Sequence, residues 1–120
     1  MQNYRRLSVW RKAHVVALNV HRLTERIPRG RHAGLIGQLQ RAALSIPANT
    51  AEGASRATDR DFAKFLQAAL ASTTEVEYHL EFAADAAIIP RREFTLRQQE
   101  VIEVTRMLTG LVKHVREADR

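Results

Sequence analysis

The sequence predicts an all-α protein, an antiparallel up-down-up-down four-helix bundle that occupies residues 1–120 as a single domain. Apolar residues recur at spacings of three and four over four long segments, as they do on one face of an α-helix. Proline or glycine lies near the breaks between these segments. No segment shows the alternation of apolar and polar residues that is typical of a strand. Because the connections are short, consecutive helices should be antiparallel neighbours.

The first helix is predicted over residues 9–27, with Ser8 as its N-cap and with Pro28 and Gly30 ending it. Apolar residues cover most of the circumference of this segment, whereas a bundle helix needs an apolar stripe of only about 100°. Excess apolar surface on a water-soluble protein usually marks a contact between subunits. The first helix therefore predicts a homo-oligomer.

The second helix is predicted over residues 33–55 and contains Pro47. Proline inside a helix removes one backbone hydrogen bond, so a kink is expected at Pro47, and a complete break into two helices is the alternative. Gly53 is expected either to allow close approach of another helix or to begin the C-terminal cap.

The third helix is predicted over residues 59–87, where Thr58 and Asp61 resemble a capping box with Asp in place of the usual Glu. The fourth helix is predicted over residues 91–118, and Pro90 suits its first turn.

The charge of the chain is positive and unevenly distributed. The formal net charge is +6, and residues 1–64 hold 12 Lys and Arg against 4 Asp and Glu, whereas residues 65–120 hold 7 against 9. A one-sided basic field is typical of a protein that binds a polyanion or an acidic partner, and plain solubility charge is the alternative.

Composition also limits the possible classes of protein. The chain has no cysteine, which excludes a disulfide framework and thiolate chemistry. No apolar run approaches the roughly 18 residues that a membrane-spanning helix needs, and no apolar stretch of signal-peptide length follows the early arginines. We therefore expect a cytoplasmic protein without a membrane partner.

The predicted second helix carries a polar stripe whose members are spaced three or four residues apart and so share one face. They are Gln38, Arg41, Ser45, Asn49, Glu52 and Arg56. The predicted third helix offers Ser72, Glu75 and His79 on a face of its own. We interpret the two sets as a structural polar network, within one chain or between subunits, with Arg41 and Glu75 as an ion pair. A surface that faces a ligand and ordinary solvent exposure are the alternatives.

Seven basic residues are expected to form one pole of the bundle, because the start of the first helix and the end of the second lie at the same end of an up-down bundle. They are Arg5, Arg6, Arg11, Lys12, Arg56, Arg60 and Lys64. Such residues neutralise phosphates. Only Tyr4 and Trp10 lie nearby as aromatics, so binding of nucleic acid should depend on the backbone and be weakly sequence-selective.

No constellation typical of catalysis is present. A di-iron bundle needs two Glu-x-x-His motifs and two further carboxylates, and Glu75 with His79 faces no second pair. His14 and His21 share a helical face but are expected to be packed or interfacial rather than metal ligands. We therefore predict no enzyme, no catalytic residue, no cofactor and no metal site.

The chain resembles the four-helix-bundle proteins encoded in intervening sequences of 23S ribosomal RNA genes, whose fold group includes the accessory variability proteins of diversity-generating retroelements. The resemblance covers about the first 85 residues. It is carried by Leu7-Ser8-Val9-Trp10 with Ala13, by Thr24 with Ile27-Pro28, by Gly34-Leu35, Gln38-Leu39 and the run from Arg41 to Gly53, and by Phe62, Phe65-Leu66, Ala69, Ser72, Glu75, Glu77, Leu80 and Ala83.

This resemblance implies a barrel-like homopentamer around a central channel, and a role with nucleic acid, RNA in particular. Our first hypothesis is a non-enzymatic oligomeric scaffold that binds nucleic acid through phosphate contacts at its basic pole or channel. A protein–protein adaptor that docks an acidic partner, such as the reverse transcriptase that the retroelement relatives accompany, is the second. A passenger protein with little selected activity is the third.

Overall fold

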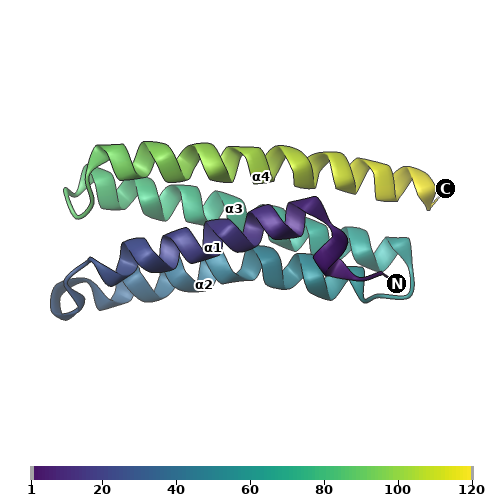
Figure 1. The fold of residues 1–120 in the computed structure, drawn as a ribbon, viewed down its shortest axis with the longest axis horizontal. Coiled ribbons are helices and arrows are strands. Elements are labelled where there is room, and N and C mark those ends of the chain that lie inside the picture. Colours follow the sequence, from purple (N-terminus) through teal and green to yellow (C-terminus); the bar gives the residue numbers. More distant parts are fainter. Residues whose placement is uncertain (1, 120) are drawn as a thin grey trace.

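The protein is all-α in the computed structural model, which describes residues 2–119 and contains no strand among them. Its elements are a short 3-10 helix, η1 (Tyr4–Arg6), and four α-helices, α1 (Ser8–Glu25), α2 (Arg29–Ala54), α3 (Asp59–Asp85) and α4 (Arg91–Ala118). The four helices lie side by side in a body of 48 × 21 × 19 Å (Figure 1). The predicted four-helix fold is confirmed.

The arrangement of the helices follows from their short connections. The α1–α2 and α3–α4 connections lie at one end of the bundle, and the α2–α3 connection lies at the other end, near the start of α1 and the end of α4 (Figure 1). Helix α1 packs against α2 and α4, and α3 packs against the same two helices. Because α1 and α3 are diagonal to each other, their outer faces point in opposite directions.

The core is built from one apolar face of each helix. Leu39, Ile46, Leu66, Leu80 and Leu108 are among its largest fully buried side chains. Burial of a leucine or isoleucine side chain contributes about 1.5–3 kcal/mol, so these periodic positions supply most of the driving force for folding. The spacing that predicts the helices from the sequence also determines which face of each helix is buried.

Capping confirms one predicted helix start and corrects another. The Thr58 hydroxyl accepts a hydrogen bond from the Asp61 backbone N–H at 3.2 Å, as the sequence predicts for the start of α3. The prediction of Ser8 as an N-cap is wrong, because Ser8 is already the first residue of α1 and the extended residue before it is Leu7. Helix η1 occupies the segment just before Leu7, so the chain enters α1 one residue earlier than predicted.

Helix α2 is kinked near its start. An additional helical turn begins at Arg29, directly after Pro28, and the helix that follows the kink at His32 begins at residue 33, as the sequence predicts. His32 has non-helical angles at this kink, with φ −133° and ψ 26°. A proline just before a helix costs no hydrogen bond, because its missing N–H would have no partner there. The missing N–H destabilises a helix only when the proline lies in the helix interior. Pro28 therefore ends α1 and allows α2 to start at once.

Helix α2 runs without interruption through Pro47, which is buried. His32 is its single residue with non-helical angles. A complete break at Pro47, the alternative to a kink, is therefore wrong.

Gly53 permits a close approach of α2 and α3. A Cβ at this position would lie 2.8 Å from Phe65 Cβ, 2.9 Å from Phe62 Cδ1 and 3.2 Å from the Phe62 carbonyl oxygen. Gly53 lies inside α2, whose C-cap is Ser55, so close approach rather than capping explains this glycine.

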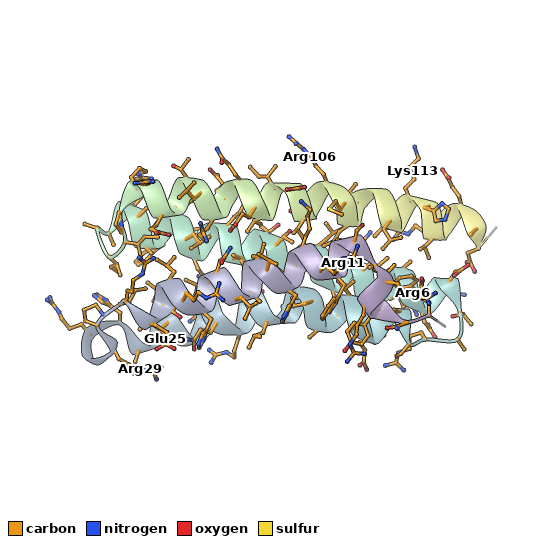
Figure 2. All side chains as sticks on the ribbon, viewed as in Figure 1. Arg6, Arg11, Glu25, Arg29, Arg106 and Lys113 are labelled. Carbon is orange, nitrogen blue, oxygen red and sulfur yellow. The ribbon has the colours of Figure 1, made fainter. Side chains whose placement is uncertain are left out.

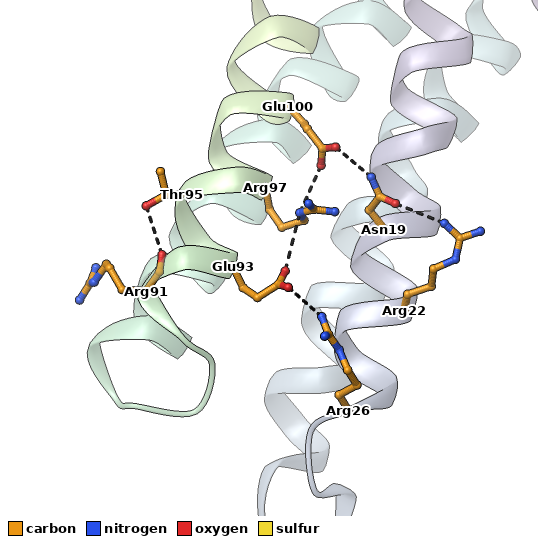
Figure 3. Close-up of polar contacts among 8 residues, drawn as sticks. All are labelled: Asn19, Arg22, Arg26, Arg91, Glu93, Thr95, Arg97 and Glu100. Carbon is orange, nitrogen blue, oxygen red and sulfur yellow. Dashed lines mark hydrogen bonds and ion pairs between the residues drawn. The ribbon is translucent and has the colours of Figure 1, made fainter.

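The helix pair α1–α4 is joined by polar contacts (Figure 3). Arg26 Nη2 on α1 lies 3.0 Å from Glu93 Oε1 on α4. One to two turns away, Asn19 Nδ2 donates to Glu100 Oε2 at 2.9 Å. These contacts form a polar seam between α1 and α4. The other pairs of neighbouring helices are instead joined by more extensive packing.

Arg97 lies at the centre of this α1–α4 seam. Its Nε is 3.3 Å from Glu100 Oε1 and 4.0 Å from Glu93 Oε2, and only 17% of its side chain is exposed. Arg97 Nε and Glu100 Oε1 are buried and lack hydrogen-bond geometry with any partner. Arg97 therefore holds the two carboxylates by charge, and each of them in turn contacts α1.

We expect Gly53→Ala to destabilise the protein. Overpacking costs about 1–3 kcal/mol, which exceeds the gain of at most about 1 kcal/mol that alanine brings to a helix interior. Gly110→Ala is the matched control, because Gly110 also lies inside a helix but has nothing within 4 Å of an added Cβ. Urea unfolding should show a lower midpoint for Gly53→Ala and an equal or higher one for Gly110→Ala. The same gain for both variants would contradict the close approach.

We expect Arg97→Met to lower the free energy of unfolding by about 1–3 kcal/mol, because the half-buried Glu100 would lose its cation, whereas Glu93 would keep Arg26. Adding Glu100→Gln should recover part of the loss, as a double-mutant cycle by urea unfolding would show. Arg106→Met is the control, since Arg106 is exposed and points away from the bundle (Figure 2). Equal decreases in the free energy of unfolding for Arg97→Met and Arg106→Met would show that the α1–α4 seam does not contribute to stability.

Candidate nucleic-acid interface

Five residues of the predicted basic pole lie toward one end of the bundle, and they come from η1, the α2–α3 connection and the start of α3. They are Arg5, Arg6, Arg56, Arg60 and Lys64. Arg11 and Lys12 lie farther along the bundle, where Glu100 and Glu103 of α4 line a groove with them. Figure 2 shows Arg6 toward this end, Arg11 nearer the middle, and Glu25 and Arg29 at the other end. The backbone N–H of Gln2 donates to the carbonyl of Ala54 at 2.9 Å, which holds the N-terminal segment against the end of α2.

Local contacts position the arginines of the N-terminal segment. The Asn3 side chain caps η1 by accepting from the Arg5 backbone N–H at 3.1 Å. Arg11 Nη1 donates to the Arg5 carbonyl oxygen at 3.0 Å, and the Arg5 guanidinium lies 4.6 Å from the centre of the Tyr4 ring. Helix η1 is thereby folded back on α1, so Arg5 and Arg6 are presented beside Arg11.

The aromatic residues at this end contact other residues of the same chain. The ring centres of Tyr4 and Trp10 are 4.8 Å apart in an edge-to-face arrangement, and Trp10 stacks on His14 at 5.1 Å. Tyr4 and Trp10 are half-buried. Neither indole nor phenol offers an open face to a base, so recognition by base stacking has no support here.

Two members of the basic pole are ion-paired, and five are not. Lys12 Nζ lies 2.6 Å from Glu103 Oε1, and Arg56 Nη2 lies 2.8 Å from Glu52 Oε1. Within residues 2–119, Arg5, Arg6, Arg11, Arg60 and Lys64 make no ion pair. Guanidinium groups without a carboxylate keep their donors for phosphate oxygens.

The structure adds a cation that the sequence analysis missed. Arg116, near the end of α4, lines a groove of about 340 Å³ together with Arg60 and Lys64. The sequence could have predicted this position, because in an up-down-up-down bundle the fourth helix ends at the same end of the bundle at which the first helix begins. Asp59 and Asp119 line the same groove, so its charge is mixed. Arg5, Arg6 and Arg11, which we call the N-terminal arginines, are linked by the hydrogen bond from Arg11 to the Arg5 carbonyl and make no ion pair among the described residues.

The predicted polar network exists within one chain at a single point between α2 and α3. The hydroxyls of Ser45 and Ser72 hydrogen-bond to each other across the two helices. Asn49 Nδ2 donates to the Ser45 carbonyl at 2.8 Å within α2. Ser72 is buried and Ser45 half-buried, so this contact fixes the register of α2 on α3.

The predicted ion pair between Arg41 and Glu75 does not form within one chain, and its formation between subunits stays a prediction. Both side chains are exposed, and the salt bridges among the described residues do not include them. Arg41 instead lies along its own helix, with Nη1 3.2 Å from where a Cβ on Gly37 would be. The two residues lie toward the outside of the α2–α3 contact, where water satisfies them more cheaply than a fixed pair does. For Gln38 and His79, a contact between subunits stays a prediction.

The histidines singled out from the sequence lie on the surface of α1. His14 stacks on Trp10, and His21 Nε2 lies 2.9 Å from Glu25 Oε1 one turn away. Over residues 2–119, no three His, Asp or Glu side chains come together in a way that could hold a metal. None of the helices in this range is both long enough and apolar enough to cross a bilayer.

Comparison with known proteins shows the family. The model of the 23S rRNA-intervening sequence protein family matches residues 5–110. A solved protein of unknown function from the S23 ribosomal protein family of Bacteroides thetaiotaomicron VPI-5482 is similar in fold, with a TM-score of 0.83 and 24% identity over 88% of this chain and 98% of that one. No curated protein matches the chain. Because the family model spans most of the sequence, the chain belongs to the 23S rRNA-intervening sequence protein family.

Proposed function

We propose that the protein is a non-enzymatic, oligomeric scaffold in the cytoplasm that binds nucleic acid, RNA in particular, through phosphate contacts at its basic pole. The observation that carries the proposal is the cluster formed by the N-terminal arginines. Arg5, Arg6 and Arg11 come together through η1 and make no ion pair among the described residues.

The side chains of the basic pole are suited to contacts with the phosphate backbone of a nucleic acid rather than with its bases. Guanidinium groups bind phosphate in a bidentate way, and contacts of this kind position a protein without reading sequence. Tyr4 and Trp10, the nearby aromatics, are half-buried and contact each other. The proposed binding is therefore weakly sequence-selective and falls steeply as salt concentration rises.

Assembly would multiply this charge. One chain brings three N-terminal arginines, a modest number for tight binding, whereas a ring repeats the set once per subunit. The resemblance favours a pentamer, and the exposed apolar side chains of α1 and α2, Val15, Leu18 and Leu44, support a subunit interface. Whether the poles line a channel or face outward, each added subunit adds phosphate contacts.

We expect Arg5→Ala/Arg6→Ala/Arg11→Ala to weaken binding to structured RNA and to make its salt dependence shallower. Each lost phosphate contact should lower the slope of log affinity against log salt by about 1, so the slope should fall by up to about 3. Lys12 is left in place because it pairs with Glu103. Fluorescence anisotropy with structured RNA and duplex DNA, over about 50–200 mM salt, provides the measurement.

The matched control is Arg31→Ala/Arg91→Ala/Arg92→Ala, which removes the same charge from the other end of the bundle. We expect its salt slope to stay close to that of the unaltered protein. Equal losses in the two triple variants would show that net charge, not this pole, governs binding. Absence of binding at about 50 mM salt would overturn the nucleic-acid proposal, and a protein adaptor with an acidic partner would then be the leading function.

A further inference from the structure

The bundle exposes apolar side chains on two faces that carry opposite charge. Leu18 on α1 is 38% exposed and Leu44 on α2 is 61% exposed, whereas Tyr78 and Phe82 on α3 are 60% and 48% exposed. A monomeric protein gains nothing from large apolar side chains held in water, so paired exposures of this size point to contacts with other molecules.

The first face is a groove between α1 and α2. It has a volume of about 290 Å³, and Leu18 and Leu44 line it together with His14, His21 and Arg29. Its surroundings are basic, because Arg29 lines it and the exposed Arg22 and Arg41 lie one helical turn from Leu18 and Leu44. Glu25, which contacts His21 at 2.9 Å, is the acidic residue beside it. We call this face the α1–α2 groove.

The second face is the outer surface of α3. Tyr78 and Phe82 are four residues apart and therefore adjacent on the helix, and Glu75 and Glu81 flank them. Residues 65–90 contain no Lys or Arg but four Asp and Glu. Neither Glu75 nor Glu81 makes an ion pair within residues 2–119. We call Glu75, Tyr78, Glu81 and Phe82 the α3 aromatic face.

The two faces cannot meet within one chain. Helices α1 and α3 are diagonal in the bundle and do not contact each other (Figure 1), and Tyr78 and Phe82 on α3 are exposed to solvent. A second copy of the chain, however, can place its α3 aromatic face against the α1–α2 groove of the first copy. The aromatic residues of one copy match the apolar groove of the next, and the acidic flank matches the basic surroundings of the groove.

We propose that the α3 aromatic face of each copy docks into the α1–α2 groove of a second copy, with Tyr78 and Phe82 as anchors. Buried aromatic residues are common centres of binding energy in interfaces, and complementary charge fixes the orientation. The contact joins two different surfaces, so each docked pair leaves one groove and one aromatic face free, and copies add until a ring closes. This inference rests on the oligomeric part of the proposed function and names its contact.

Two variants test the contact by blocking one face each. Leu44→Asp places an acidic group in the groove, opposite the acidic flank, and Phe82→Arg places a cation on the aromatic face, opposite the basic groove. Each alone should have the mass of one chain, 13.6 kDa, by light scattering after size exclusion. An equimolar mixture should give a heterodimer of about twice that mass, because one intact groove and one intact aromatic face remain. Native mass spectrometry then distinguishes a heterodimer from either homodimer.

Leu96→Asp is the matched control, because Leu96 is also exposed, at 39%, but lies on α4 outside both faces. It should keep the mass of the unaltered protein. Circular dichroism checks that the variants fold, and Leu18→Asp with Tyr78→Arg repeats the test if either of the first pair does not.

Three outcomes would overturn the inference. If the unaltered protein is an oligomer and a variant keeps the same oligomeric mass, the altered face is not part of the subunit contact. The proposal of an oligomeric scaffold would then be unaffected. Single-chain variants that fail to combine on mixing would show that the two faces do not meet each other. An unaltered protein that is monomeric at high concentration would remove the oligomer itself, whereas binding of nucleic acid is decided separately by the salt series with the N-terminal arginine variant.

Discussion

The close packing of α2 on α3 is the constraint on which the arrangement of the molecule depends. Gly53 allows the two helices to approach so closely that Phe62 and Phe65 lie against its backbone, and the Ser45–Ser72 hydrogen bond fixes their register farther along. The end of α2 is thereby held in place, and the N-terminal segment attaches to it through the Gln2–Ala54 hydrogen bond. The corner between α2 and α3, with the N-terminal segment attached to it, thereby carries Arg5, Arg6, Arg56, Arg60 and Lys64 toward one end of the bundle.

Helix α1 has a different balance of interactions. It is joined to α4 through the polar seam around Arg97, and its outer side retains exposed Val15 and Leu18. Polar contacts of this kind specify position more than they add stability, because desolvation offsets much of the attraction between the charges. Helix α1 buries one apolar face in the core and leaves further apolar surface outside, so burial of that outer surface between subunits would add hydrophobic stabilisation.

Residues of opposite charge serve the proposed binding of phosphate and the proposed self-association, and they lie on different parts of the molecule. The N-terminal arginines lie on η1 and the first turns of α1 and make no ion pair among the described residues, whereas the acidic surface of α3 lies on the side of the bundle. Phosphate is attracted to the first and repelled by the second. If copies associate through the acidic side, the basic ends remain uncovered, so self-assembly and binding of a polyanion do not compete for the same residues.

The sequence by itself determined the local features of this protein. Apolar periodicity, Pro28, Pro90 and the Thr58 cap define the four helices and their buried faces, because these signals act over one or two turns. Only the tertiary structure decided which side chains meet: Arg97 lies between two glutamates, Arg41 and Glu75 stay apart, and Arg116 joins the basic pole. A rotation or shift of one helix by a single residue leaves the apolar pattern acceptable but changes every polar partner. Partners of that kind depend on how all four helices pack together, which no single segment encodes.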